Sequence, residues 1–333
     1  MSELPSYITK TAGQTKVQQL VHFITESISS GKLKVGDILP SVNQFSGETG
    51  FSRDTVFKAY RILKKRNIIE SAPTKGYYVA NESFRVLMLL DDFSAFKEQL
   101  YQSFRKNLPE SYSVDLLFHH YNTEVFRQLI QNSLGRYSIY VVMNIDHKSV
   151  DPILEKIDFN KLLILDMGHP ENGKVNYLVQ DFNEAVQLCL EQGIKNFRKY
   201  DELVLVYSEK DTPHPPETVG AVKTFCKKNK ISFRKINQFD TTIPIKKGQA
   251  YFVIRDSDLV ALIKVCRANG FEPGHDIGIL SYNDTPMKQI VGGGISVISA
   301  DFELMGELAA GFVKNKRRIE KVLPTFLILR DSL

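Results

Sequence analysis

The chain has 333 residues, more than the roughly 100 to 200 of one ordinary domain, so we expect at least two domains. A hydrophobic content of 43% and a charged content of 24% are ordinary for folded proteins and exclude extensive disorder. No apolar run approaches the roughly 18 to 20 residues of a membrane span, and three scattered cysteines without a secretory signal exclude a disulfide scaffold and predict a cytoplasmic protein.

The net charge of +5 is concentrated in the first quarter of the chain. Residues 1–80 contain eleven Lys or Arg and six Asp or Glu, so their excess equals the net charge of the whole chain. Six basic residues fall between positions 53 and 66, where Asp54 is the only acid: Arg53, Lys58, Arg61, Lys64, Lys65 and Arg66. This density is typical of a surface that binds a polyanion, although a solvated helix face explains it equally well.

The first 80 residues predict three helices and a hairpin. Residues 1–15 lack periodicity and are expected to be a flexible tail. From Val17 to Ile28 the apolar residues recur with helical spacing, which predicts a helix ending near Gly31. A second helix is expected over residues 41–48, a third over 53–66, and a strand, turn and strand over 68–79. This is the outline of a winged helix-turn-helix domain over residues 16–80, followed by a linker over 81–84.

From residue 85 onward, apolar strand-like runs alternate with helical patterns. The expected strands are 86–90, 114–118, 139–143, 162–165, 203–207, 251–254 and 277–280, and the expected helices are 94–106, 123–134, 183–191, 217–228 and 257–268. Continuous apolar strands separated by helices favour parallel sheets buried between helices, hence an α/β fold. The pattern alone leaves open one large sheet or two lobes.

The N-terminal segment resembles a known family of DNA-binding domains. Residues 31–79 read GKLKVGDILPSVNQFSGETGFSRDTVFKAYRILKKRNIIESAPTKGYYV. The elements G-x-L-x-x-G-D-x-L-P-S, S-R-x-T-V-x-x-A-Y-x-x-L and the closing G-Y-x-V resemble the winged-helix domain of the GntR regulators, at that family's spacing. The resemblance implies a DNA-reading head.

The C-terminal part is similar to the effector domain of the LacI and GalR repressors. The matching stretches are RDSDLVALIKVCRANGFEPGHDIGILSYNDTP, GISVISADFELMGELAAGFV and LPTFLILRDSL. The resemblance implies that residues 85–333 form a two-lobed, doubly wound parallel-sheet domain of the type I periplasmic-binding-protein kind. A GntR head joined to such a domain is the arrangement of the arabinose repressor group, which the whole chain resembles.

The start of the third helix is placed to read bases. Arg53 can bind guanine O6 and N7 bidentately, and Gly76 at the hairpin tip permits close approach to DNA. Val42 and Asn43 stand where the family often has an acidic and a basic residue, so operator preference is not carried over. The predicted DNA-binding residues are Ser41, Asn43, Ser52, Arg53, Thr55, Lys58, Arg61, Lys75 and Gly76. The alternative for each charged residue is a solvated surface side chain.

Ligands of doubly wound sheets bind beyond the carboxyl ends of the strands. Sugar hydroxyls suit Asp, Asn and Arg side chains together with an aromatic face, for which Phe93 and Tyr282 are candidates. By the resemblance, Asn283 replaces a common Asp of the family, and Glu217 stands where an Arg is frequent. The predicted ligand-binding residues are Asp92, Phe93, His119, Asn144, Asp181, Glu217, Arg255, Asp256, Tyr282 and Asn283. The alternative for each is a helix cap or a solvated loop.

Other motifs give less information about function. No G-x-S-x-G, Walker lysine or H-E-x-x-H motif occurs, so we predict no catalytic residues and no enzyme. His119 and His120 point to opposite faces of an extended segment, so neither a metal site nor a cofactor is expected. The glycine run 292–294 precedes a strand rather than a helix, and we expect a flexible connection between the lobes.

These observations together predict a cytoplasmic transcriptional regulator. We expect a homodimer that binds palindromic double-stranded operator DNA and represses carbohydrate-utilisation genes, with a monosaccharide, a pentose or a deoxyhexose, bound between the two lobes. One alternative keeps this architecture but senses a purine, another metabolite or a protein partner. A second alternative, an enzyme fused to a winged helix, needs more than the roughly 250 residues that follow the head.

Overall fold

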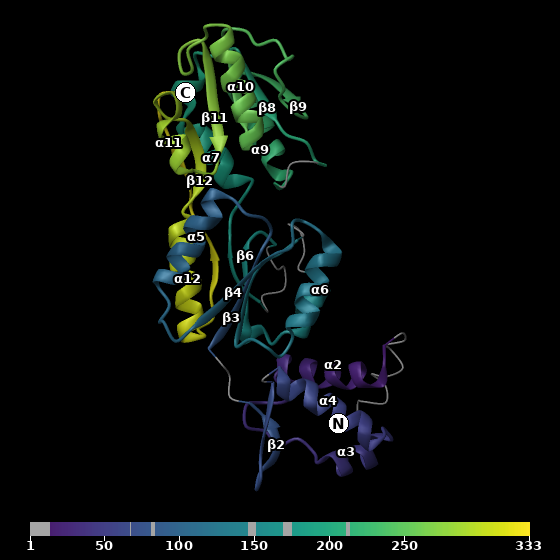
Figure 1. Ribbon diagram of the computed structural model, residues 1–333. Coiled ribbons are helices and arrows are strands. Elements are labelled where there is room, and N and C mark those ends of the chain that lie inside the picture. The colour runs from purple at the N-terminus through teal and green to yellow at the C-terminus, as the bar shows by residue number, and fades with distance from the viewer. Residues whose placement is uncertain (1–13, 67, 81–83, 146–150, 169–174, 211–213) are drawn as a thin grey trace. The chain divides into compact units, whose positions relative to one another are not determined.

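The computed structural model describes residues 14–66, 68–80, 84–145, 151–168, 175–210 and 214–333 (Figure 1). The predicted tail therefore lies almost entirely outside the described residues, as does the predicted linker apart from Phe84. The chain divides into two compact units. The first unit comprises Met1–Asp92, Leu108–Tyr177 and Ala309–Glu320, and the second comprises Phe93–Asn107, Leu178–Leu308 and Lys321–Leu333.

The first unit begins with three helices and a hairpin. These are α2 (Lys16–Ser29), α3 (Val42–Thr49), α4 (Arg53–Lys65), β1 (Ile69–Ala72) and the antiparallel β2 (Gly76–Val79). Each helix starts at a Thr or Ser whose hydroxyl accepts a hydrogen bond from the third helical amide: Thr15, Ser41 and Ser52. One such cap is worth about 1 kcal/mol. Phe45, Val56 and Tyr60 fill the core between the helices. We call this part the head.

The rest of the first unit is built on a mostly parallel sheet. The strands of this sheet are β3 (Arg85–Leu90), β4 (Ser113–Phe118), β5 (Ile139–Met143), β6 (Leu162–Asp166), β7 (Asn176–Val179) and β13 (Glu320–Val322), in the order β13-β7-β6-β5-β3-β4. The last two residues of β7 and of β13 are assigned to the second unit. The pairs β3/β4, β3/β5 and β5/β6 are parallel. The connections include α6 (Thr123–Ser133) and two short 3₁₀ helices, η1 (Pro152–Lys156) and η2 (Phe159–Lys161).

The second unit contains a sheet of the same kind. Its strands are β8 (Glu202–Val206), β9 (Ser232–Ile236), β10 (Gln249–Val253), β11 (Ile277–Tyr282), β12 (Ser296–Ala300) and β14 (Thr325–Ile328), in the order β14-β12-β11-β10-β8-β9. Only the β12/β14 pair is antiparallel among the pairs of this sheet. The helices are α7 (Glu184–Gln192), α8 (Ile194–Phe197), α9 (Glu217–Asn229), α10 (Asp256–Ala268), α11 (Pro286–Ile290), the 3₁₀ helix η3 (Val291–Gly293), α5 (Ala95–Lys106) and the first half of α12 (Phe302–Asn315).

The side chains of β8 alternate between two apolar clusters, which shows why helices cover both faces of this sheet. Leu203 and Leu205 join a cluster with residues of α7 and α9, whereas Val204 and Val206 join a cluster with residues of α10. Because neighbouring side chains of a strand point to opposite faces, helices must pack on both sides. The expected fold class, a winged helix-turn-helix followed by a doubly wound α/β domain with two sheets, is confirmed.

The glycine run 292–294 corrects one expectation. It lies wholly inside the second unit, between α11 and β12, so it does not connect lobes. A Cβ on Gly294 would come within 2.7 Å of Arg330 Cδ, and one on Gly293 within 2.6 Å of Asp331 Oδ2. Gly293 and Gly294 therefore allow close packing against the C-terminal segment, whereas Gly292 has nothing within 4 Å of its missing Cβ. Among the described residues, no helix is both long and apolar enough to cross a membrane.

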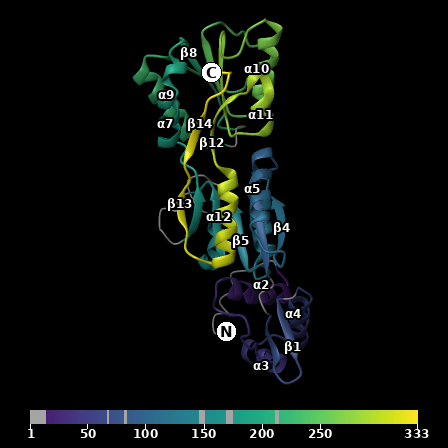
Figure 2. The same ribbon diagram turned by 90° about the vertical axis from the view of Figure 1, so that its left-hand side faces the viewer.

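Helices α5 and α12 lie side by side, as both views show, and α5 contacts the first half of α12 within the second unit (Figures 1 and 2). The rings of Phe96 and Phe302 are tilted by 42° with centroids 4.7 Å apart, and Ser103 Oγ donates to the Glu303 carbonyl at 2.7 Å. A Cβ on Gly306 would overlap the Leu100 carbonyl oxygen. The close approach of these helices therefore depends on glycine at this position.

We expect Gly306→Ala to lower the free energy of unfolding by about 1 to 3 kcal/mol, because α5 must move away. Gly311 provides a matched control, since it lies on the same helix with nothing within 4 Å of its missing Cβ. Gly311→Ala should raise stability by up to about 1 kcal/mol through helix propensity. Urea unfolding of both variants measures the difference. Equal stability of the two variants would contradict this account of the packing.

Candidate functional site

The start of α4 presents basic residues to solvent. Arg53 and Arg61 are exposed, and within the described residues neither makes an ion pair. Lys58 Nζ lies 2.7 Å from Asp54 Oδ2, with 53% and 68% of the two side chains exposed. An exposed pair of this kind contributes less than about 1 kcal/mol, so Lys58 can exchange Asp54 for a phosphate at little cost.

The predicted hydroxyl contacts have a local role in the free head. Ser52 Oγ accepts from the Thr55 amide at 3.2 Å, and the two side-chain oxygens lie 2.8 Å apart. Ser41 Oγ accepts from the Gln44 amide at 3.2 Å and so caps α3, which leaves Asn43 exposed on the first turn. These hydroxyls fix where the helices begin.

The hairpin between β1 and β2 forms the predicted wing. Gly76 has φ +78°, a left-handed conformation that glycine adopts without strain. Lys75 Nζ lies 4.1 Å from the centre of the Tyr78 ring, which holds this cation at the exposed tip. Figure 1 shows α3 on the side of the head away from α6, and α2 on the side facing α6. The surface formed by α3, the start of α4 and the hairpin is therefore open.

At the carboxyl edge of the first sheet, the predicted ligand residues contact the protein itself. His119 is buried, its Nδ1 accepts from the Tyr121 amide at 3.2 Å, and its Nε2 lies 3.2 Å from the Met143 carbonyl. This geometry requires a neutral ring that donates from Nε2. Asn144 is also buried, and its Oδ1 accepts from the Asp151 amide at 3.3 Å. His119 therefore has no ring nitrogen left for a ligand, which corrects its expected role.

Tyr121 belongs to the same edge and was not predicted from the sequence. Its hydroxyl donates to Asp91 Oδ2 at 2.7 Å, while Asp91 Oδ1 accepts from the Asp92 amide at 2.7 Å. Burial and the nearby Asp91 carboxylate raise the pKa of Tyr121, so the phenol stays protonated and remains a donor. The Asp92 backbone is thereby fixed, and its half-buried side chain remains a ligand candidate.

The predicted cationic and acidic residues of the second unit are joined in ion pairs. Arg255, which precedes α10, binds both carboxylate oxygens of the buried Asp258 at 2.8 and 3.1 Å. Asp256, the first residue of α10, has 68% of its side chain exposed and places Oδ1 2.9 Å from Lys288 Nζ. Arg255, not Asp256, occupies the N-cap position of this helix.

Lys288 is a buried cation that sequence reasoning missed. Only 5% of its side chain is exposed, and Nζ donates to the carbonyls of Tyr282 and Asn283 at 2.8 and 3.0 Å. Burial lowers the pKa of Lys288, and the Asp256 carboxylate opposes this effect. The lysine thus ties the residues after β11 to the start of α10.

Asn283 is the clearest ligand candidate of the second unit. Its backbone has φ +58°, and its amide donates to the Ile298 carbonyl at 2.8 Å. Its side-chain Oδ1 is buried and, within the described residues, has no hydrogen-bond partner. A buried acceptor without a donor costs about 1 to 3 kcal/mol, which a ligand hydroxyl or amine can recover.

The remaining ligand candidates differ in how accessible their side chains are. Tyr282 is 2% exposed and lies against Phe182 and His214, with centroids 6.1 and 4.4 Å away, so the expected open ring face for a sugar is wrong. Phe93, in contrast, is 71% exposed. Asp181 accepts from three amides at the start of α7, those of residues 183, 184 and 185, and therefore has the structural role of a helix cap.

Glu217 lies half-buried on the first turn of α9, where the helix dipole favours a carboxylate. It stands where an arginine clamp is common in the resembling family, and the structure offers a carboxylate there instead. Within the described ranges, no three His, Cys, Asp or Glu side chains are grouped as a metal site would require. The polar groups that this unit offers to a ligand are therefore carboxylates, the Asn283 amide oxygen and an arginine, Arg255, that is already paired with Asp258.

Comparison with known sequences assigns both parts of the chain. Residues 16–79 match the gntR family of bacterial regulatory proteins, and residues 197–333 match the periplasmic binding protein-like domain. The uncharacterized HTH-type transcriptional regulator YcxD of Bacillus subtilis is 38% identical over 68 residues, 20% of this chain and 15% of that protein. The mannosyl-D-glycerate transport/metabolism system repressor MngR of Escherichia coli is 39% identical over 83 residues, 25% of this chain and 34% of that protein. The matched segment thus spans well under half of these relatives.

Solved structures resemble the larger part of the chain. The trehalose repressor from Escherichia coli has a TM-score of 0.60 at 12% identity, over 74% of this chain and 100% of that one. A complex of the transcriptional regulator CelR with cellobiose has a TM-score of 0.59 at 14% identity, over 88% and 100%. At identities this low, the likeness shows a shared fold and nothing more. The chain therefore joins a winged helix-turn-helix domain of the gntR family to a periplasmic-binding-protein-like domain with the fold of LacI-family regulators.

Proposed function

We propose that the chain is a DNA-binding transcriptional regulator that represses carbohydrate-utilisation genes and is controlled by a small sugar. The observation that carries the proposal is the joining of a gntR-type head, which holds the whole net positive charge, to a domain of the periplasmic-binding-protein kind. Structural neighbours include a trehalose repressor and a cellobiose complex, which supports a saccharide effector. We place the head at residues 16–80 and the effector domain at residues 85–333.

Two heads of a homodimer bind two half-sites of a palindromic operator in this proposal. Arg53 reads a guanine from the start of α4, and Asn43 contacts DNA from α3. Lys58 and Arg61 contact phosphates, and the Lys75–Gly76 tip meets the backbone or the minor groove. The exposure of these residues and the open face on which α3 lies support this assignment.

The effector is a neutral polyhydroxylated molecule, a monosaccharide such as a pentose or a deoxyhexose. Arg255, Lys288 and Arg330 of the second unit each face a carboxylate, those of Asp258, Asp256 and Asp284. Because these cations are already neutralised, an anionic ligand gains little from them. The buried Asn283 Oδ1 and the exposed oxygen of Asp256 accept from hydroxyl groups of this effector.

The DNA assignment predicts strong salt dependence and a specific role for Arg53. We expect the affinity for a duplex selected from a randomised pool to fall roughly a thousandfold between 50 and 200 mM salt, as about six phosphate contacts require. Arg53→Ala should cost about 1 to 3 kcal/mol on that duplex and relax one base position. Lys58→Ala is the control, because it should weaken all duplexes alike. Unchanged sequence preference in Arg53→Ala would remove this residue from base reading.

The effector assignment predicts a defined effect of Asn283→Gly. Glycine accepts the positive φ of Asn283, so this change removes the amide without backbone strain. A thermal-shift screen of pentoses, deoxyhexoses, hexoses and purines identifies the ligand, since one at 100 times its Kd adds about 2.7 kcal/mol. We expect Asn283→Gly to weaken that ligand at least about tenfold.

Lys230→Gly is the matched control, because Lys230 also has a positive φ, of 59°, but caps the far end of α9. It should leave ligand affinity unchanged. If both variants bound as tightly as the original chain, Asn283 would not be a ligand residue. A purine as the sole hit would favour the alternative effector class over a sugar.

A further inference from the structure

Helix α2 of the head is buried on two faces. Leu20, Ile24 and Ile28 pack into the core of the head. His22, Thr25, Glu26 and Ser29 recur at helical spacing on another face, and Thr25 and Ser29 are only 2% exposed. A small three-helix head needs one buried face of this helix for its own core. The second, polar face must therefore be covered by something else.

That cover is supplied by α6 and η1 of the first unit. Lys156 Nζ of η1 lies 2.6 Å from Glu26 Oε1 and 3.4 Å from Gln131 Oε1. Gln131 of α6 in turn places Nε2 3.0 Å from His22 Nδ1. A continuous set of polar contacts thus joins α2 to two elements of the effector domain.

Backbone contacts bring the same surfaces close together. The Asp158 amide, just before η2, donates to the Ser29 carbonyl. A Cβ on Gly135, which follows α6, would lie 3.2 Å from the Thr25 carbonyl oxygen and 3.3 Å from Thr25 Cα. The end of α6 therefore approaches α2 as closely as glycine allows.

The other end of η1 is tied to the edge of the sheet. Asp151 caps η1 by accepting from the Ile153 amide at 2.9 Å, and its own amide donates to Asn144 Oδ1. The Asp151 carboxylate also pairs with Arg127 of α6 at 3.1 Å. Asn144 follows β5 directly, at the edge where ligands of such sheets bind. Five residues, about 10 Å of 3₁₀ helix, separate this edge from the head contact.

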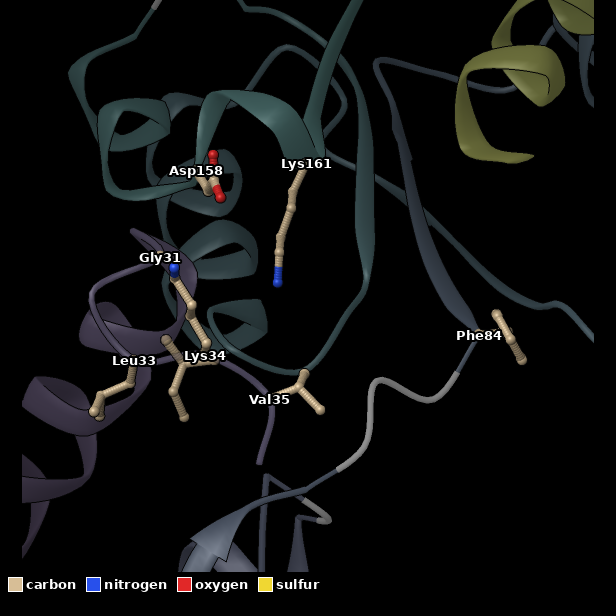
Figure 3. Close-up of a pocket in the computed structure, with 8 residues that line it drawn as sticks. Gly31, Leu33, Lys34, Val35, Phe84, Asp158 and Lys161 are labelled. Carbon is tan, nitrogen blue, oxygen red and sulfur yellow. The ribbon is translucent and has the colours of Figure 1, made fainter. Parts of the chain in front are cut away.

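The docking of the head is polar and incompletely packed. A cavity of about 770 Å³ opens beside it, lined by apolar residues such as Leu33 and Val35 together with Lys34, Asp158 and Lys161 (Figure 3). This open groove leaves part of the contact unpacked, so the docking lacks the dispersion energy of a close-packed core. The docked face of α2 is also not the face of the head on which α3 lies (Figure 1). Docking leaves the DNA-binding surface accessible and fixes its position.

We propose that η1 is the lever that couples effector binding to the position of the head. Asn144 and Asp151 hold one end of the lever, and Lys156 holds α2 through Glu26 at the other. The docked head is the DNA-binding form, because it fixes the spacing of two heads in a dimer. Displacing η1 releases α2 and lowers affinity for paired half-sites. This inference rests on the proposed function, but the contact itself is measurable without effector or DNA.

The contact is tested by hydrogen exchange of the α2 amides in the full chain. Lys156→Met should speed exchange over residues 16–29 at least about tenfold, because the buried polar face loses its cover. Lys264→Met, an exposed lysine on α10, is the control and should change nothing there. Unchanged exchange in Lys156→Met would overturn the docking role of Lys156.

Gly135→Ala and Gly270→Ala form a second matched pair. Both glycines follow helices with positive φ, of 72° and 64°, but Gly270 has nothing within 4 Å of its missing Cβ. Only Gly135→Ala should speed exchange in α2. Equal exchange in the two variants would show that α6 does not hold the head.

The lever itself is tested by a double-mutant cycle. Asn144→Ala should speed α2 exchange in the original chain but have no further effect in Lys156→Met, because the two residues act through the same element. Additive effects would overturn the lever. Asn144→Ser provides the same test if Asn144→Ala does not fold. If Asn144 and Lys156 are not coupled but the chain still binds DNA selectively, the lever is wrong and the proposed function stands. If the original chain does not bind DNA, only the proposed function is contradicted.

The docking should also weaken in acid. Burial lowers the pKa of His22, Arg66 and Lys156 lower it further, and Glu26 opposes them. The docked state therefore favours the neutral His22 ring. The stabilisation of docking by His22 is complete above the ordinary histidine pKa of about 6.5, and it is lost as the pH falls through the lowered pKa. Exchange of α2, corrected for intrinsic rates, should accelerate as the pH falls below the ordinary histidine pKa of about 6.5. His22→Gln should remove this pH dependence, and its persistence would assign it to another group.

Discussion

Ion pairing at the carboxyl edge of the second sheet is the constraint on which the proposed neutral effector depends. Lys288 is buried because Asp256 and two carbonyls satisfy its ammonium group, and Arg255 is fixed because Asp258 binds it at two points. Each pair removes a charge that would otherwise attract an anion. What remains is a buried amide oxygen at Asn283 and carboxylate oxygens, a set that suits hydroxyl donors. The neutral effector that we propose agrees with which groups the protein has already satisfied.

The sequence was sufficient for most of the fold because the informative segments are locally distinctive. β5 and β11 are buried throughout and read as continuous apolar runs. β9, in contrast, has the sequence SFRKI with two charged residues on a sheet edge, and the prediction omitted it. The prediction also omitted α12, where two glycines interrupt an apolar stretch, because Gly306 reflects contact with α5 rather than a local preference.

Several candidate ligand residues have partners within the protein that the sequence did not reveal. His119, Asp181 and Tyr282 were each expected to contact ligand, yet their partners are the Met143 carbonyl, the α7 amides and the rings of Phe182 and His214. Partners such as Met143 and His214 lie tens of residues away along the chain, so local patterns do not reveal them. Lys288 was overlooked for the same reason, since an isolated lysine reads as a surface charge.

The polar face of α2 illustrates how a regulator is assembled from two domains. Apolar spacing in this helix predicted the core of the head, whereas His22, Thr25 and Glu26 read as solvated positions until their cover is known. Polar docking is weaker than an apolar interface of the same size and responds to small displacements.

The most direct test of the central claim is a titration on one DNA duplex. The full chain is used to select a duplex from a randomised pool, and its affinity for that duplex is measured as neutral monosaccharides and their phosphorylated forms are added. The account predicts selection of two symmetric half-sites and release by a neutral monosaccharide, while its phosphorylated form has little effect. Release by the phosphorylated form alone, or failure to select any sequence, would contradict it.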